Sequence, residues 1–276
     1  HSYHHYYKLY TNEHVYYSWC DKALVMKYNF VTEPAKPKQA VVITPTVGSH
    51  KIVDAVNSVA MQTYSNVEHL IVIDGPEFEH KFSSNFAYDH DLLDKIKRVT
   101  LPLNTGANGF NGQRIYASFP HLVDHDYVFF LDEDNWYAPD HVESLVKVLE
   151  QNDFAYSLRS IYDEEKNYLC DDNCESLGKW PIYFTHDDPQ YLIDTSSFAF
   201  RKEFIQRSCH LWHSGAWGED RRYLYAVKDH CKWDTNGKHT LSYRLGGNEA
   251  SVQADFFEKG NELQLKHYNN KLPWKD

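Results

Sequence analysis

Short apolar runs alternate with segments of helical spacing from residue 40 onward. Residues 41–44 (Val-Val-Ile-Thr) form the first run and residues 70–73 (Leu-Ile-Val-Ile) the second. Strand, helix and strand within about 35 residues predict a βαβ unit with two parallel strands. The helix between them, which we expect Ser49 to cap, is predicted by apolar residues at helical spacing: Ile52, Val53, Val56, Val59 and Ala60.

The same alternation continues to about residue 158. Residues 98–101, 127–131 and 154–158 are predicted to be further strands. Pro139 is expected to open a helix, because proline is favoured at the first helical position. The apolar stripe of that helix is Val142, Leu145, Val146 and Leu149. The pattern predicts an α/β fold, a mostly parallel central sheet with helices on both faces, whose ligand site lies beyond the carboxyl ends of the strands.

The ends of the chain are less regular. Residues 1–39, rich in Tyr and His at the start and with Pro34 and Pro37 near the end, are expected to be an N-terminal extension and linker. Residues 40–245 are predicted to form the main domain. Residues 246–276 are expected to be a tail that packs on this domain or leads to another. The first residue is not Met, so we expect a processed, tag-trimmed or excised piece of a longer protein.

Composition narrows the class of partner. The chain has 276 residues, with 28 Lys and Arg against 39 Asp and Glu, a formal net charge of −11. An acidic chain is a poor general binder of polyanions, so nucleic acid is not an expected partner. No run of about 18 apolar residues occurs, so no transmembrane helix is expected. The five scattered cysteines favour free thiols and a cytoplasmic location.

Polar segments follow the first four predicted strands, at the edge where the carboxyl ends of parallel strands meet. They contain Thr44, Pro45 and Thr46, then Asp74, then Asn104 and Gly106, and finally residues 132–134 (Asp-Glu-Asp). Asp132 and Asp134 could hold Mg²⁺ or Mn²⁺, which commonly takes one or two carboxylates and completes its shell with phosphates and water. The alternative is an acidic turn in solvent.

These motifs resemble family 2-like glycosyltransferases of the GT-A fold, in order, over roughly residues 40–245. The segments that carry the resemblance are 41–46, Gln-Thr-Tyr at 62–64, 70–74, Asn-Thr-Gly at 104–106, Asp-Glu-Asp at 132–134, 194–201 and Trp-Gly-Glu-Asp at 217–220. Two departures stand out. Gly75-Pro76 replaces a second Asp that many relatives carry, and only Arg114 stands near the place of their Ala-Arg-Asn segment.

The resemblance implies a role for each matching residue. Asp220 would be the general base, with Glu219 beside it. Asp134 would ligate the metal that bridges the diphosphate, and Asp132 would contact the ribose or the metal. The implied nucleotide contacts are Thr44, Pro45, Thr46, Asp74 (to the base), Asn104, Gly106 and Arg114. The bland alternative for Asp220 is capping, since acids favour a helix N-terminus.

Weaker candidates each have a structural alternative. His239 could be a third metal ligand or an ordinary core or surface histidine. Arg244 could meet the diphosphate or form an ion pair. Trp212 and Trp217 could form a platform for an acceptor sugar or pack in the core. The acidic pairs at 171–172 and 187–188 are expected in solvated loops.

The resemblance therefore implies a metal-dependent glycosyltransferase of polysaccharide biosynthesis, using a nucleotide sugar, most simply a UDP-sugar, and a glycan acceptor, with further domains possible in a longer chain. Inversion is expected, although similar Glu-Asp segments occur in retaining enzymes. A nucleotidyltransferase is disfavoured because residues 46–51 carry one Gly and one Lys, too few for a triphosphate loop. The remaining alternative is a non-catalytic carbohydrate-binding or scaffolding module that keeps the fold.

Overall fold

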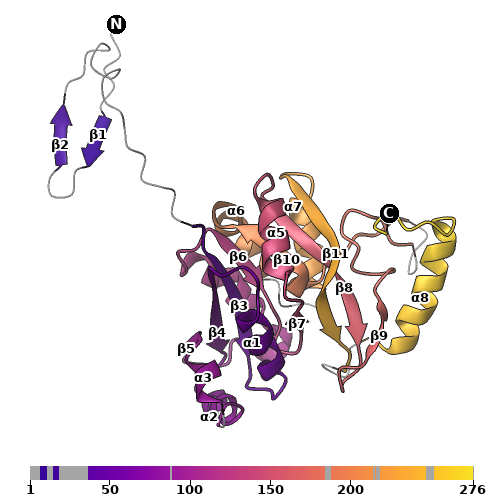
Figure 1. Cartoon of the computed structure of the whole chain (residues 1–276), viewed down its shortest axis with the longest axis horizontal. Helices are drawn as coiled ribbons and strands as arrows, with labels where there is room; N and C mark the ends of the chain where they lie inside the picture. Colours follow the sequence, from indigo (N-terminus) through magenta and orange to yellow (C-terminus); the bar gives the residue numbers. More distant parts are fainter. Residues whose placement is uncertain are drawn as a thin grey trace, which may run out of the picture. The chain divides into compact units, whose positions relative to one another are not determined.

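The computed structural model describes residues 7–10, 15–18, 37–87, 89–183, 188–213, 215, 218–246 and 252–275. The chain divides into two compact units, His1–Pro37 and Lys38–Asp276. In the first unit, β1 (Tyr7–Tyr10) and β2 (Val15–Ser18) pair as antiparallel strands. All other elements belong to the second unit, whose central sheet and surrounding helices are drawn in Figure 1.

The described strands of the second unit form one nine-stranded sheet in the order β5-β4-β3-β6-β10-β8-β11-β7, with β9 paired to β8. Strands β3, β4, β5 and β6 are mutually parallel, and so are β8 and β11. Strand β10 is antiparallel to both of its neighbours. The bounds are β3 (Ala40–Thr46), β4 (Val67–Ile73), β5 (Ile96–Thr100), β6 (Tyr127–Phe130), β7 (Trp136–Tyr137), β8 (Phe154–Tyr162), β9 (Tyr168–Asp171), β10 (Phe198–Arg201) and β11 (Trp233–Arg244).

Both faces of the sheet are buried, which explains the continuous apolar runs in the sequence. Neighbouring residues of a strand point to opposite faces. In β3, Val41 and Ile43 therefore join one core cluster, and Ala40 and Val42 join the other. The predicted α/β fold, a mostly parallel sheet between two helical layers, is confirmed.

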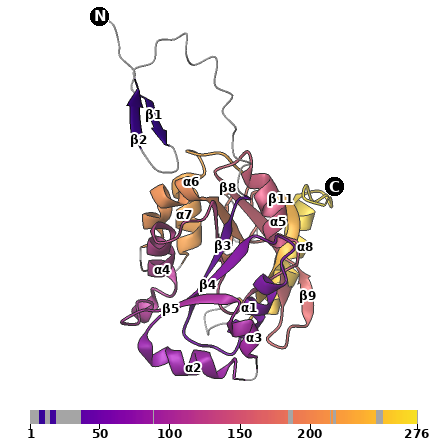
Figure 2. The same cartoon turned by 60° about the vertical axis from the view of Figure 1, so that its left-hand side comes forward.

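Helices cover both faces of the sheet, and Figure 2 shows this arrangement from another side. Side chains of α1 (Ile52–Ala60), α2 (Glu79–Ser84), α3 (His90–Leu93) and α5 (His141–Leu149) pack in the Ala40 cluster. Those of α4 (Gln113–Ser118), α6 (Lys202–Ser208) and α7 (Glu219–Val227) pack in the Val41 cluster. Helix α8 (Ala254–His267) lies beside β9 in both views, where Phe257 is buried with Ile161 and Leu245.

Two predicted helix starts were wrong in detail. Helix α1 begins after Lys51, and the hydroxyl of Ser49 accepts the backbone N–H of Lys51 at 3.3 Å instead of capping the first turn. Helix α5 begins after Asp140, so Pro139 stands just outside it. Among the described residues, no helix is both long and apolar enough to cross a membrane.

The strand order brings the chemistry-bearing segments to one edge. The carboxyl ends of β4, β3 and β6 lie there side by side, and that of β8 lies at the same edge beyond β10. Because β10 runs the other way, its beginning lies at this same edge, preceded by the 3-10 turn η5 (Thr195–Ser197). A second 3-10 turn, η6 (Cys209–Trp212), lies against α4 and α7.

Candidate active site

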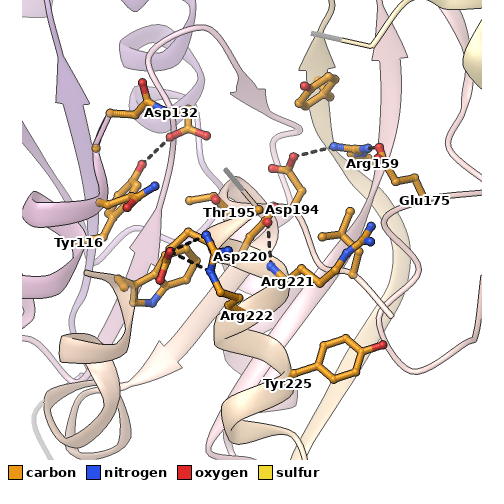
Figure 3. Close-up of a pocket in the computed structure, with 18 of the residues that line it drawn as sticks. Tyr116, Asp132, Arg159, Glu175, Asp194, Thr195, Asp220, Arg221, Arg222 and Tyr225 are labelled. Atoms are coloured by element: carbon orange, nitrogen blue, oxygen red, sulfur yellow. Dashed lines mark hydrogen bonds and ion pairs between the residues drawn. The ribbon is translucent and has the colours of Figure 1, made fainter. Parts of the chain in front are cut away.

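A cavity of about 920 Å³ opens at this edge of the sheet. Its size suits a ligand of moderate mass. Side chains from α4, β8, β11, α7 and the segment before β10 line it, and Figure 3 shows many of them converging. Its charged lining residues are Asp132, Arg159, Glu175, Asp194, Glu219, Asp220, Arg221 and Arg222. The structure thus brings three predicted site residues, Asp132, Glu219 and Asp220, into one cavity.

Asp220 stands in the first turn of α7. The chain enters this helix through Gly218, whose φ of 76° lies in the left-handed region that glycine adopts without strain. The Asp220 carboxylate accepts the backbone N–H of Arg221 at 2.7 Å. Burial, together with the nearby charge of Asp194, raises the pKa of Asp220 to about 7. A carboxyl with that pKa can take up a proton near neutral pH.

Glu219, the residue before it, has a different setting. Its side chain is buried, and one of its oxygens accepts a hydrogen bond from the Arg222 guanidinium at 3.2 Å. Arg222 is three residues further along α7, a spacing at which helical side chains meet. Glu219 therefore forms a salt bridge within the helix, and Asp220 is the better placed of the two to act as a base.

Asp132 comes directly after β6 and its carboxylate is held by two hydroxyl groups. Tyr116 of α4 donates to Oδ1 at 2.8 Å, and Ser196 of η5 donates to Oδ2 at 3.2 Å. Burial, with the charges of Asp134 and Asp194, raises the pKa of Asp132 to about 7. The hydroxyls fix the direction of the carboxylate but do not neutralise its charge.

The orientation of the Ser196 hydroxyl is fixed by two further hydrogen bonds. It accepts the backbone N–H of Asp132 at 3.0 Å and the side-chain amide of Asn135 at 3.2 Å. A hydroxyl has two acceptor sites and one proton, so its proton is left for the Asp132 carboxylate. Asn135 in turn accepts the backbone N–H of Arg244 at 3.1 Å, which ties β11 to the same unit.

The other two acids of the motif point to different partners. Glu133 accepts the Thr46 hydroxyl and the Ser49 backbone N–H, so it holds the loop after β3. Asp134 is mostly buried, which raises its pKa even though the charges of Lys51 and Arg244 oppose the shift. Burial without enough compensating charge leaves Asp134 a carboxylate that a cation would stabilise.

Asp132 and Asp134 fit a divalent cation as two carboxylate ligands of an incomplete shell. Burial first, and then the charge of Asp134, raises the pKa of Asp132, and both residues are carboxylates, the ligands that Mg²⁺ and Mn²⁺ prefer. Among the described residues, no group of three or more His, Cys, Asp and Glu side chains is arranged to hold a metal. Two carboxylates need further oxygens to complete a shell, so these residues fit a metal that arrives with a phosphate ligand.

Three of the lining residues, Arg159, Glu175 and Asp194, form with the buried Asp172 an ion-paired group that we call the Arg159 cluster. The Arg159 guanidinium donates to Asp172 at 2.7 Å, to Asp194 at 2.6 Å and also to Glu175. Arg159 is only 2% exposed, and the ring of Tyr243 lies 4.3 Å from its guanidinium carbon. Three carboxylates on one buried cation leave the cluster with a negative charge.

Asp172 corrects a prediction, because the pair at 171–172 was expected in a solvated loop. Asp172 is fully buried, and besides Arg159 it accepts the backbone N–H groups of Cys174, Glu175 and Ser176. Burial alone would raise its pKa, but Arg159 and these donors outweigh it and hold the pKa below the ordinary value. Asp188 of the second acidic pair is exposed, and Asp187 lies outside the described residues.

Asp74 and its partners form a second group on the same edge. Asp74 accepts the backbone N–H and hydroxyl of Thr105 at 2.8 and 2.7 Å and the backbone N–H of Gly106 at 2.7 Å. Arg114 donates to the backbone carbonyl of Thr105 at 3.1 Å, and Asn104 has a buried side-chain oxygen without a hydrogen-bond partner. The predicted nucleotide residues Asp74, Asn104, Gly106 and Arg114 thus lie together, outside the cavity lining.

Thr44, Pro45 and Thr46, at the end of β3, make different contacts from one another. Thr44 is fully buried and its hydroxyl bonds to His69 of β4 at 2.9 Å, inside the sheet layer. A nucleotide contact by the Thr44 side chain is therefore not supported, since a strand alternates and this position faces the α1 layer. Pro45 packs close to Gly112, and Thr46 donates to Glu133.

His239 is not brought together with Asp132 or Asp134. Burial lowers its pKa, and the charges that act on it belong to Asp171, Lys275 and Asp172, on the β9 side of the sheet. In β11 it is paired with Leu158 of β8. The prediction of His239 as a metal ligand alongside Asp134 is not supported by this arrangement.

Arg244 and Trp212 have the structural surroundings that were expected as alternatives to a binding role. Arg244 forms a buried ion pair with Asp54 and lies 5.0 Å from the ring of Trp136. Trp212 is 1% exposed and stacks on Tyr223 at 4.7 Å, so it is a core residue that also borders the cavity. Trp217 lies outside the described residues.

The sequence reasoning missed most of the cavity's polar lining, notably Tyr116, Arg159, Glu175 and Asp194. One signal was present. Arg159 stands inside the apolar run of residues 154–162, and a charged residue in a strand buried on both faces requires partners. Those partners come from residues 13 to 35 positions away, at spacings that no local pattern reveals.

Two comparisons with known proteins bear on the fold and family. Crystal structures of S. aureus TarS 1-349 match the chain at 14% identity. The complex with UDP has a TM-score of 0.54 and the match covers 84% of this chain and 66% of that one. For the complex with UDP-GlcNAc the values are 0.53, 80% and 64%. The chain thus spans less than two thirds of these structures, and at this identity they show a shared GT-A fold.

The sequence comparisons complete the assignment. No curated protein matches the chain. The family model described as Glycosyl transferase family 2 matches residues 41–208, more than half of the 276 residues, and this span contains the Asp132–Asp134 motif, Arg159 and Asp194. The chain belongs to glycosyl transferase family 2.

Proposed function

We propose that this protein transfers a sugar from a UDP-sugar to a hydroxyl group of a glycan acceptor, with inversion at the sugar carbon and with a divalent metal bound beside Asp134. The observation that carries the proposal is the pairing of Asp132 and Asp220 in one cavity. Both are acids whose pKa is raised to about 7, and they come from different parts of the fold. In this proposal, Asp132 is the carboxylate on the donor side of the cavity and Asp220 is the base on the acceptor side.

Asp220 would take the proton of the attacking hydroxyl. Burial makes its ionised form costly, and proton uptake removes that cost, so the pKa of about 7 suits a base that works near neutral pH. Asp220 belongs to α7 and Asp132 follows β6, so the proposed base and the proposed diphosphate contact come from different elements. Attack from the side opposite the leaving group inverts the configuration.

Asp134 and Asp132 would hold the diphosphate end of the donor. A divalent cation bound there would supply neutralisation of the charge that develops on the leaving diphosphate. Tyr116 and Ser196 keep the Asp132 carboxylate in a fixed direction for this role. Asp74 with residues 104–106, and Arg114 beside them, would hold the base of the nucleotide.

The choice of UDP rests on the structural neighbours. The TarS structures that share the fold were solved with UDP and with UDP-GlcNAc, which makes a UDP-sugar the first donor to test. No residue of this chain identifies the sugar itself.

The proposal is tested by two substitutions that separate binding from transfer. Asp134→Asn should abolish the metal-dependent stabilisation by UDP in a thermal-shift assay. Wild type at 100 times the dissociation constant of UDP should gain about 2.7 kcal/mol. Asp220→Asn should keep that stabilisation and lose about 10²- to 10⁴-fold in the rate of UDP release from UDP-sugars with a glycan acceptor.

Asp229→Asn is the matched control, because Asp229 is an exposed acid beyond the end of α7. It should change neither quantity. Near-normal turnover of Asp220→Asn would remove the base assignment. If UDP, GDP, CDP, ADP and dTDP all fail to stabilise wild type with Mn²⁺ or Mg²⁺ while a glycan binds, the non-catalytic carbohydrate-binding module takes the place of the enzyme.

A further inference from the structure

Helix α7 carries two more side chains into the cavity beyond Asp220. Arg221 and Tyr225 are four residues apart, so they lie on one face of the helix, a turn from each other. Both line the cavity, and Figure 3 shows them on the side of Asp220 that faces away from Asp132. The cavity therefore continues past the proposed base, away from the proposed donor side.

The ring of Tyr225 is exposed yet fixed in place. It is 41% exposed, although large apolar surfaces are usually covered. Its hydroxyl accepts the backbone N–H of Tyr191 at 3.2 Å, and the Tyr191 ring meets it edge-on with centroids 6.3 Å apart. The Lys228 ammonium lies 5.6 Å from the ring centroid. A preorganised aromatic ring loses little conformational entropy when a ligand packs on it.

Arg221 is a cation with its donors available. Among the residues that the structure describes, its guanidinium makes no ion pair and no side-chain hydrogen bond. The other arginines of the cavity differ, since Arg159 is held by three carboxylates and Arg222 bonds to Glu219. A guanidinium offers five N–H donors and no acceptor, so it suits a ligand rich in oxygen acceptors.

We propose that Arg221 and Tyr225 form a subsite for a second sugar of the acceptor, so that the preferred acceptor is an oligosaccharide or glycan chain and not a monosaccharide. This rests on the proposed function. The face of an aromatic ring packs on the C–H face of a sugar, and the guanidinium donates to its hydroxyls. From Asp220 to Tyr225 is about 7.5 Å along the helix, which is comparable with the step between adjacent sugars in a chain.

The test compares short and long acceptors of the same sugar. The probes are methyl glycosides of glucose and N-acetylglucosamine, paired with cellotriose, maltotriose and chitotriose, with UDP-glucose and UDP-GlcNAc as donors and UDP release as the readout. Wild type should show at least ten-fold higher kcat/KM for the trisaccharide that it accepts than for the matching monosaccharide.

Tyr225→Ala and Arg221→Met should each raise the KM for that trisaccharide about five-fold, leaving kcat, the monosaccharide rate and UDP binding unchanged. This is the size expected from one lost ring contact or hydrogen bond. Tyr225→Phe keeps the ring and should stay close to wild type. Tyr168→Ala is the matched control, because Tyr168 is also an exposed tyrosine (56%) but lies on β9, outside the cavity lining.

Equal kcat/KM for short and long acceptors in wild type would overturn the subsite, and so would an equal loss on both in Tyr225→Ala. If no saccharide of the panel is used or bound while UDP still stabilises the protein, the subsite is also rejected but the donor site stands. If UDP itself does not bind, the proposed function fails before the subsite is in question.

Discussion

Two buried carboxylates, Asp172 of the Arg159 cluster and Asp220 of the cavity lining, have pKa values shifted in opposite directions. Asp172 accepts hydrogen bonds from Arg159 and from three backbone N–H groups, and its pKa is held below the ordinary value in spite of burial. Asp220 accepts one, from its neighbour's backbone, and burial raises its pKa to about 7. Burial is common to both, so the charge of Arg159, together with the backbone donors, makes the difference.

The comparison separates carboxylates that hold the fold together from carboxylates that can exchange a proton. A buried carboxylate that is paired with a cation and accepts several N–H groups stays ionised and does not take up a proton easily. A buried carboxylate without a paired cation is costly to keep ionised, and that cost allows it to accept a proton at neutral pH. Asp172 is of the first kind, and Asp132 and Asp220 are of the second.

The largest effect is expected when the cation of the Arg159 cluster is removed. Arg159→Met leaves Asp172, Glu175 and Asp194 buried around a neutral side chain. Breaking a buried ion pair from one side costs about 3–5 kcal/mol. We expect a loss of that size in the free energy of unfolding, measured by urea denaturation at pH 7.5.

Lys179→Met is the matched control, since Lys179 pairs with Asp234 at 2.6 Å on the surface, with both side chains more than 40% exposed. Surface pairs contribute at most about 1 kcal/mol. A similar small loss in both variants would mean that the Arg159 cluster is no more than an ordinary ion pair.

The pH dependence of transfer is the next largest effect. A base must be ionised before it can take a proton, and Asp220 has a pKa of about 7. With saturating UDP-sugar and metal, kcat should therefore rise about ten-fold per pH unit below pH 7 and level off above it. A steady-state profile from pH 5 to 9 measures this. A rate that is flat from pH 5 upward would show that the base has an ordinary carboxylate pKa.

The smallest expected effect is a change in the free energy of unfolding that has opposite signs for Asp172 and Asp220. Asp172→Asn should lower the free energy of unfolding by about 2 kcal/mol at pH 8, because Arg159 loses a charged partner. Asp220→Asn should raise it by about 1–2 kcal/mol at the same pH, because a buried charge that costs free energy is gone. Urea denaturation of both variants at pH 8 and pH 5 measures the difference.

The sign follows from proton linkage. The pKa of Asp220 is near 4 when unfolded and about 7 when folded, so between these values the folded protein holds a proton that the unfolded chain has released. Its contribution to stability is therefore lost as pH rises from about 4 to 7. The gain from Asp220→Asn should shrink toward pH 5, and a gain that is the same at both pH values would contradict the raised pKa.

The sheet and its motifs could be predicted from the sequence because both depend on local patterns. Apolar runs in β3, β4 and β6 and the acids after them are visible without any contact information. The reversed direction of β10 is not, because residues 198–201 are as apolar as a parallel strand would be. Direction depends on which neighbours a strand pairs with, and those pairings are long-range.

The candidate site was predicted unevenly for a related reason. Asp132 and Asp220 follow recognisable motifs, but their raised pKa values come first from burial and then from nearby charges, including Asp194, which lies 62 positions after one and 26 before the other. The hydrogen bond between Thr44 and His69 and the position of His239 near Asp171 depend on long-range packing, which the sequence does not show. A residue type and its place along the chain indicate a candidate, and only the packing around it decides its role.

The reversal of β10 has a consequence for how such an enzyme could diversify. Because β8 arrives at the active edge and β10 departs from it, the chain between residues 163 and 193 leaves and returns at the same border of the cavity, and it brings Glu175 and Gln190 with it. Changes of length in this segment outside β9 would leave the pairing of β8 with β10 intact. If the proposed function holds, the acceptor preference could therefore change by insertion or deletion here without rebuilding the sheet.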